Sequence, residues 1–203
     1  MIYTQTISPA SGDRVPAAQG TSDEALVALI AQRDKRALQQ LYSRHHVRIY
    51  RFALRFLNDE AAAEDTVSEV FIDVWRQAER FEGRSQVTTW LLAIARNKAL
   101  SLLRRRSSEE LDDEVAEFIE DPSDNPEVAM LKSQRASVLQ DCLTQLSPAH
   151  REIVDLVYYH EKTVEEVAEI IDVPANTVKT RMFYARKRIG ELMAAKGINR
   201  AHF

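Results

Sequence analysis

Residues 176–188 combine short polar side chains with cations, which is the chemistry needed to bind DNA. Amide and hydroxyl groups hydrogen-bond to base edges in the major groove, while Lys and Arg bind phosphates. The residues expected to contact DNA are Asn176, Thr177, Lys179, Thr180, Arg181, Lys187 and Arg188. Their spacing predicts that they lie on the solvent side of one helix. The alternative is a charged helical hairpin on the surface, with no DNA partner.

Two helices joined by a tight turn must position these side chains. Thr163 followed by Glu166 predicts a capping box, so the first helix begins there. Residues 172–174 end it, because Pro174 cannot continue that helix but can begin the next one. The apolar residues that recur at helical spacing in the second helix are Val178, Met182, Ala185 and Ile189. These apolar residues would be buried on one side of the second helix, and the polar and basic residues of 176–188 would lie on its solvent side. The pattern therefore predicts a helix-turn-helix.

The rest of the chain also has helical spacing. Asp34 can cap a helix, an apolar stripe runs through 64–80, and Gly83 interrupts the pattern before it resumes over 87–103. With 5 glycines in 203 residues and few β-branched runs, there is little material for a sheet. We therefore predict an all-α protein, with two small helical domains joined by an acidic flexible linker. The C-terminal domain carries the helix-turn-helix.

Changes in composition set the expected boundaries. The expected segments are a disordered tail over 1–22, a first domain over 23–106, the linker over 107–130, a second domain over 131–195 and a tail over 196–203. Residues 107–127 contain ten acidic residues and no basic one, so the net charge of −4 hides a mildly basic block on each side. The linker is expected either to be merely solvated or to mimic a polyanion in a basic channel of a partner.

Composition also argues against membrane and secreted proteins. No stretch approaches the roughly 20 apolar residues that span a bilayer. The first 20 residues lack the basic leader and apolar run of a secretory signal. Cys142 is the only cysteine, which excludes an internal disulfide and fits a reducing cytoplasm. Its apolar helical surroundings predict a buried thiol.

Enzymatic functions find no support in the residue pattern. The glycines never approach the spacing of a phosphate-binding loop. The histidines lack zinc-ligand spacing, and a single cysteine cannot build a thiolate site. His45 and His46 are expected on an ordinary helix surface. We therefore expect no metal, no cofactor and no catalytic residue.

Both halves of the chain resemble the domains of one family. Similarity to the promoter-melting domain of bacterial sigma factors lies in residues 63–75 (AEDTVSEVFIDVW) and 81–106 (FEGRSQVTTWLLAIARNKALSLLRRR). Similarity to their −35-reading domain lies in residues 146–189 (LSPAHREIVDLVYYHEKTVEEVAEIIDVPANTVKTRMFYARKRI). With these two domains and a short linker, the chain is similar to the extracytoplasmic-function class. The resemblance assigns the polar set of residues 176–188 to the −35 element.

The resemblance implies a polymerase-docking surface on the helix of residues 63–75. Asp65, Glu69 and Asp73 recur every four residues, which places them on one face. In the family this helix docks on the clamp helices of the polymerase β′ subunit. Ser68 stands where family members usually have Gln, so we expect a somewhat altered contact. Without the family, the stripe reads as a solvated face.

The resemblance also implies a −10 site around the loop that precedes residue 87. In the family this loop captures a flipped base, and its hydroxyl, amide and cationic groups suit that chemistry. The expected −10 residues are Arg84, Ser85, Gln86, Thr88, Trp90, Arg96, Asn97 and Lys98. Trp90 is expected either in the core or near the melted strand. A separate stripe either follows the single strand or is solvated, and consists of Arg44, Arg48, Arg51 and Arg55.

The implied function is that of an alternative sigma factor. It would bind core RNA polymerase through the β′ clamp helices and the β flap, direct it to promoter DNA and open the strands, under an anti-sigma factor. The linker would thread toward the RNA exit path. Such a bacterial protein is cytoplasmic, without membrane insertion, and nucleoid-associated when active. One alternative is a dimeric helix-turn-helix regulator that needs no polymerase, although sustained heptads for a dimer are missing. The other is an adaptor that mimics a sigma factor, although such a mimic should have lost the basic face.

Overall fold

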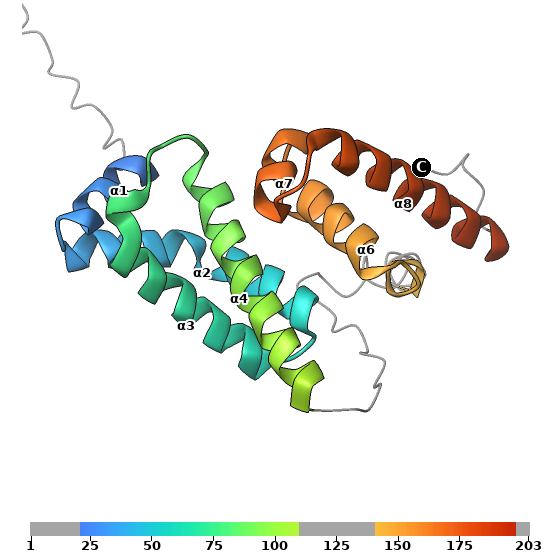
Figure 1. Ribbon diagram of the computed structural model, residues 1–203, viewed down its shortest axis with the longest axis horizontal. Coiled ribbons are helices and arrows are strands. Elements are labelled where there is room, and N and C mark those ends of the chain that lie inside the picture. The colour runs from blue at the N-terminus through green and yellow to red at the C-terminus, as the bar shows by residue number, and fades with distance from the viewer. Residues whose placement is uncertain (1–20, 110–140, 198–203) are drawn as a thin grey trace, which may run out of the picture.

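The computed structural model describes residues 21–109 and 141–197, and all of its regular elements there are helical (Figure 1). The elements are α1 (Asp23–Ala31), α2 (Lys35–Leu57), α3 (Glu60–Gln77), the 3-10 helix η1 (Ala78–Arg80), α4 (Val87–Glu109), α6 (Pro148–Val154), the π-helical turn η2 (Asp155–Tyr159), α7 (Val164–Ile171) and α8 (Ala175–Ala195). The predicted all-α class is confirmed. The interpretations of the linker and of both tails fall largely outside the described residues.

Side-chain caps set where the N-terminal helices begin. Ser22 caps α1 and Asp34 caps α2, each by accepting a hydrogen bond from a backbone N–H of the first turn. Asp59 does the same for α3, so that helix begins before the apolar stripe that starts at residue 64. The backbone N–H of Ala62 is the main cause that lowers the pKa of Asp59, and an ion pair with Arg106 adds to it. Gly83 takes a φ of 67°, a left-handed conformation that fits its position between helices.

The core of the N-terminal domain lies between α1, α2, α3 and α4. Phe52 and Leu41 of α2 pack with Val70 of α3 and Leu91 of α4, and all four are fully buried. Leu29 of α1 lies outside this core and is 37% exposed.

The C-terminal domain is held by a second set of buried side chains from α6, α7 and α8. Ile153, Val167 and Val178, one from each helix, are all fully buried. The Arg151 guanidinium closes the preceding turn by donating to the carbonyls of Leu143 (3.1 Å) and Thr144 (2.7 Å). Burial lowers the pKa of Arg151. This partly buried arginine therefore ties the turn to the start of the domain's first helix.

The two domains pack against each other, with α7 lying beside α4 (Figure 1). One continuous buried cluster contains apolar residues of both domains. This contact brings the loop before α4 next to the turn that precedes α7, which decides the environment of several predicted site residues.

Candidate nucleic-acid and protein-docking surfaces

The predicted helix-turn-helix is present in α7 and α8. Thr163 and Glu166 form the expected capping box, with both reciprocal hydrogen bonds in place. Asp172 ends α7 in a left-handed conformation with a φ of 53°, where a glycine would be unstrained. Pro174 then precedes the first residue of α8. The local signals of the sequence therefore located both ends of the turn.

One side of α8 is buried and the other carries the predicted −35 residues. Val178, Met182 and Ala185 are buried, and Ile189 is partly buried. A shallow hollow on the outer side is lined by Asn176, Thr177, Thr180 and Arg181. Lys179, Lys187 and Arg188 are exposed, and Arg188 lies 3.5 Å from Glu191. The structure thus gathers polar groups and cations on the solvent side of this helix.

Two aromatic residues of α8 were missed by the sequence analysis. Phe183 is 64% exposed and Tyr184 53% exposed, and their rings meet edge to face at 5.5 Å between centroids. Both fall outside the buried stripe of α8, and this departure from the apolar spacing was the signal that could have revealed them. They place two apolar rings among the polar groups of the outer side.

The predicted −10 residues do not form one open surface. Arg84 is exposed and pairs with Glu82 next to it in the loop, and Asn97 is also exposed. Trp90 is half-buried against Phe81, with 4.9 Å between ring centroids, and it packs on the core. Ser85 is half-buried. The remaining four residues are engaged by other parts of the chain.

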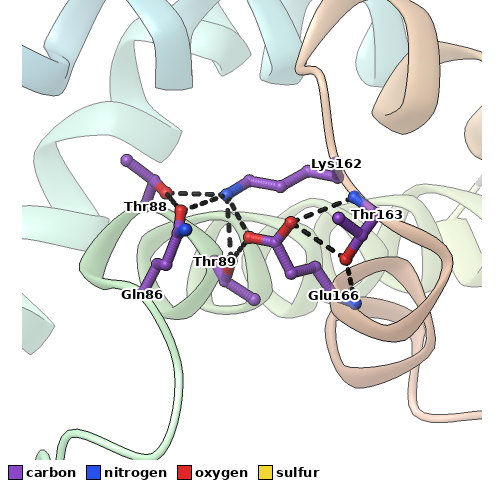
Figure 2. Close-up of polar contacts among 6 residues, drawn as sticks. All are labelled: Gln86, Thr88, Thr89, Lys162, Thr163 and Glu166. Carbon is purple, nitrogen blue, oxygen red and sulfur yellow. Dashed lines mark hydrogen bonds and ion pairs between the residues drawn. The ribbon is translucent and has the colours of Figure 1, made fainter.

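Lys162 of the C-terminal domain binds the start of α4 (Figure 2). Its Nζ donates to the hydroxyls of Thr88 at 2.7 Å and Thr89 at 2.9 Å, and lies 3.4 Å from Oε1 of Gln86. It also pairs with Glu166 at 2.7 Å. Lys162 is only 6% exposed, so this ammonium is taken out of water by groups of the other domain. Sequence reasoning missed it, because a single lysine in a turn carries no pattern.

Glu166 connects this network to the capping box of α7. Its Oε1 accepts from Thr89, and its Oε2 accepts from the backbone N–H of Thr163 at 3.0 Å. Burial alone would raise the pKa of Glu166, but the hydrogen bonds from Lys162, Thr163 and Thr89 outweigh it and lower the pKa to about 2. The carboxylate is therefore ionised throughout the neutral range.

Two further charged contacts cross between the domains. Arg96 of α4, in the predicted −10 set, donates to Glu152 of α6 through Nε. Arg55 of α2 donates to Asp155, and its Nη2 lies 2.9 Å from Nε2 of His160. All five side chains in these contacts are largely buried.

The predicted arginine stripe on α2 is therefore divided. Arg48 and Arg51 are exposed, whereas Arg55 is engaged by the other domain. Arg44 binds Asp23 at 2.7 Å. The four residues share a helix side in sequence, but they do not form one continuous solvated or DNA-facing row.

His45 departs from its predicted surface position. It is 8% exposed, and its Nε2 lies 2.6 Å from Oδ2 of Asp23. Burial raises the pKa of Asp23, but the contacts with Arg44 and His45 outweigh burial and lower it. The expectation of an ordinary surface histidine was wrong because α1 folds over this side of α2. His46, in contrast, is partly exposed.

The predicted polymerase-docking stripe lies on the outer side of α3. Asp65 is exposed, and the Glu69 side chain is 50% exposed. Asp73 pairs with Lys98 of α4 at 2.8 Å, and Glu69 lies 3.4 Å from the same ammonium. The hydrogen bond from Lys98 to Asp73 is the main cause that raises the pKa of Lys98. A predicted −10 residue thus neutralises part of the docking stripe.

A groove runs beside this stripe, between α2 and α3. It has a volume of about 460 Å³ and is lined by Tyr42, His46, Val47, Tyr50, Glu64, Val67 and Ser68. Tyr42 and Val47 are exposed apolar residues. Ser68, which stands where family members usually have Gln, therefore lines this groove next to Glu69.

Cys142 is buried, as predicted. Within residues 21–109 and 141–197, no group of three or more His, Cys, Asp or Glu side chains is arranged to hold a metal ion. None of the helices in those ranges combines the length and apolar character needed to cross a bilayer.

Comparison with known proteins identifies both domains. The family profile of sigma-70 region 2 matches residues 41–109, and that of sigma-70 region 4 matches residues 137–189. The RNA polymerase sigma-H factor of Pseudomonas aeruginosa is 31% identical, over 84% of this chain and 93% of that protein. The ECF RNA polymerase sigma-E factor of Haemophilus influenzae is 33% identical, over 85% of this chain and 95% of that protein.

Solved structures have the same fold. CnrH in complex with the cytosolic domain of CnrY superimposes with a TM-score of 0.63 at 24% identity, over 85% of this chain and 97% of that one. The sigma factor RpoE of Bartonella quintana, in complex with the anti-sigma factor NepR, gives a TM-score of 0.61 at 24% identity, over 77% and 96%. With two sigma-70 regions in order and relatives matched over nearly their whole length, the chain belongs to the ECF class of sigma-70 RNA polymerase sigma factors.

Proposed function

We propose that this alternative sigma factor reads its promoters through two surfaces on separate domains. The outer side of α8 reads the −35 element, and the loop before α4 with the first turns of α4 reads the −10 element. The proposal rests mainly on the outer side of α8. A hollow there, opposite the buried residues of the same helix, is lined by Asn176, Thr177, Thr180 and Arg181. Amide and hydroxyl groups in that hollow suit base edges, and the neighbouring cations suit phosphates.

Strand opening needs no catalytic group of its own in this proposal. A protein that binds the unpaired strand better than the duplex shifts the equilibrium toward the open form by that difference in affinity. Ser85, Gln86 and Thr88 supply hydroxyl and amide groups for a flipped base, and Arg84 and Arg96 supply cations for its phosphates. The chemistry of RNA synthesis belongs to the core polymerase.

Docking on the core polymerase is assigned to the acidic side of α3. Asp65 and Glu69 remain exposed, and the groove beside them offers apolar contact next to the charges. A basic and partly apolar surface fits both features, which supports the β′ clamp helices as the partner of this domain. The β flap is then assigned as the polymerase partner of the C-terminal domain.

Control by an anti-sigma factor completes the proposal. It is supported by the fold shared with RpoE, which was solved with the anti-sigma factor NepR. Such a sigma factor acts in the bacterial cytoplasm and joins the nucleoid when active. A dimeric regulator that binds DNA alone is not favoured, because the chain carries both sigma-70 regions.

Transcription with purified components tests the proposal. The protein is added to sigma-free core polymerase with fragmented host DNA, and the transcripts are sequenced. Start sites that depend on the protein and share two upstream motifs are expected. A variant with Asn176→Ala and Thr180→Ala should lose these starts while it still binds core. Binding to a palindrome without polymerase, together with no new starts, would contradict the proposal.

A further inference from the structure

We propose that Arg33, in the turn between α1 and α2, is a positioning residue for the −10 site. Its guanidinium holds the end of α3 and the helix η1, and η1 leads directly into the loop of residues 81–86. The proposal rests on the −10 assignment made above. It adds a residue that acts without touching DNA, by fixing where the loop stands when a base is captured.

Arg33 has a backbone conformation that its residue type rarely adopts. Its φ is 69°, in the left-handed region that favours glycine. The backbone N–H of Arg33 donates to the carbonyl of Ile30 at 2.8 Å. The N–H of Asp34 donates to the carbonyl of Leu29 at 3.1 Å, which completes a Schellman motif at the end of α1. Glycine is the usual residue at the position of Arg33 in this motif, so a strained arginine there indicates that its side chain has a role.

The Arg33 side chain reaches across to the end of α3. Its Nη1 donates to the backbone carbonyl of Trp75 at 2.6 Å. That carbonyl belongs to the last turn of α3, where carbonyls lack partners within the helix. The guanidinium also lies over the Trp75 ring, 5.6 Å from its centroid, and Nη2 lies 3.6 Å from Oε1 of Glu79 in η1. One planar group therefore joins the turn after α1 to both elements that precede the loop.

The contact with Trp75 matters more than the ion pair with Glu79. The side chains of Arg33 and Glu79 are 52% and 67% exposed, and water screens an ion pair between such groups. The hydrogen bond to the Trp75 carbonyl is short and has a charged donor, which makes it stronger than a bond between neutral groups. Stacking on the ring adds an attraction that suits a planar guanidinium better than an ammonium. Loss of the guanidinium should therefore release the end of α3.

The loop after η1 is fixed at both ends and exposed in between. At its start, the N–H of Phe81 donates to the carbonyl of Ala78 in η1 at 3.1 Å, and the Phe81 ring packs on Trp90. At its end, the carbonyl of Gln86 accepts from the N–H of Trp90 at 3.1 Å. Residues 82–84 between these anchors are exposed. Because the first anchor is η1 itself, a shift of η1 carries the exposed part of the loop with it.

A loop that is held in place before binding selects a base more sharply. Figure 1 shows α1 at the end of the domain from which this loop rises toward α4, and α1 contacts η1 there. A surface that already has its bound geometry loses less conformational entropy when a ligand binds. A hydrogen bond to a base edge also weakens steeply as its distance and angle depart from the optimum. Without the Arg33 guanidinium, the cations of the loop should still hold the strand, but the loop should distinguish the bases less well.

Three substitutions in the full-length chain separate this role from folding. Arg33→Gly removes the guanidinium and relieves the left-handed backbone, so the turn itself should not be weakened. Arg33→Lys keeps the charge and removes the planar group. Arg36→Ala is the matched control, because Arg36 is exposed in the first turn of α2 and its loss changes the local charge equally.

Two quantities are measured for each protein. The first is the affinity of the holoenzyme, assembled with core polymerase, for a fluorescent non-template-strand oligonucleotide. This probe carries the −10 motif of a promoter found by the transcription experiment above, and it is compared with oligonucleotides in which one base of the motif is changed. The ratio of the two dissociation constants is the mismatch penalty. The second quantity is the midpoint of urea unfolding of the free protein.

The wild type should show a largest mismatch penalty of roughly ten-fold. Arg33→Gly should reduce this penalty to about two-fold while the urea midpoint stays unchanged, because the hydrogen bonds that read the base lose their geometry. Arg33→Lys should reduce the penalty in part, since an ammonium can still reach the Trp75 carbonyl but stacks less well. Arg36→Ala should keep the full penalty.

The outcomes separate this proposal from the proposed function. A full penalty in both Arg33 variants would overturn the positioning role. An equal loss in Arg36→Ala would overturn it too, by assigning the effect to net charge. A penalty that falls only together with the urea midpoint in both Arg33 variants would assign the effect to folding, and would likewise overturn the role. If the wild type shows no penalty at any position of the motif, the −10 assignment itself is overturned, and the role of Arg33 with it.

Discussion

Lys98 of α4 forms an ion pair with Asp73 of α3, with 2.8 Å between Nζ and Oδ2. This contact joins a residue expected to bind −10 DNA to a residue expected to dock on the polymerase. Lys98 also lies 3.4 Å from Glu69, so one ammonium faces both carboxylates. The side of α3 that remains most open to a partner is therefore the part around Asp65 and Glu69.

Charge reversal at Glu69 should weaken docking on the polymerase. Glu69→Lys places a cation against Lys98 and against a basic partner surface, so we expect core affinity to fall at least about ten-fold. The dissociation constant for core polymerase measures it. Glu79→Lys is the control, since Glu79 is exposed on η1 and pairs with Arg33 away from the stripe. Equal affinities for the Glu69→Lys variant and the wild type would move the docking surface elsewhere.

Removal of the Arg181 side chain should weaken binding to duplex DNA that carries the −35 element. If Arg181 binds a phosphate, Arg181→Ala also makes the salt dependence shallower, by roughly 0.9 in the slope of log affinity against log salt. Titrations at several salt concentrations give both values. Arg186→Ala serves as the control, because Arg186 stacks on Tyr158 at the side of α8. A loss of affinity with an unchanged slope would place Arg181 on a base instead.

The low pKa of Glu166 predicts that the stability of the folded protein depends on pH in the acidic range. Its pKa is lowered from 4.5 to about 2, so the ionised carboxylate contributes stability that is complete above about pH 4.5. That contribution is lost as the pH falls through about 2. Carboxyl NMR titration should show the pKa of Glu166 rising toward its usual value in Lys162→Met. An identical titration in the two proteins would mean that Lys162 does not hold this carboxylate in solution.

Asp59 should matter more as a helix cap than as an ion-pair partner. Asp59→Ala leaves backbone N–H groups of α3 unsatisfied, which costs about 1 kcal/mol of unfolding free energy. Asp59→Asn keeps the cap, and Arg106→Ala removes only a half-exposed ion pair, so each should cost less. Urea unfolding of the three variants measures the differences. An Arg106→Ala variant as unstable as Asp59→Ala would reverse the order.

The sequence by itself determined the helices and the helix-turn-helix. The capping box of Thr163 and Glu166 and the cap at Asp34 were both predicted, because each depends on residues within one turn of one another. The buried stripe of α8 was predicted for the same reason, since its period is a property of the helix alone. Family resemblance then supplied the assignment of residues to promoter and polymerase, which no local pattern contains.

Only the tertiary structure decided which of those residues are open to a partner. Arg96 meets Glu152, Arg55 meets Asp155, and Lys162 meets Thr88, each across a gap of dozens of residues in the chain. His45 is buried for the same kind of reason, because α1 covers it. The position of a residue in the helical repeat determines which side of the helix its side chain occupies. The partners of that side chain depend on how the helices pack against one another. The closed arrangement of the two domains was therefore invisible in the sequence.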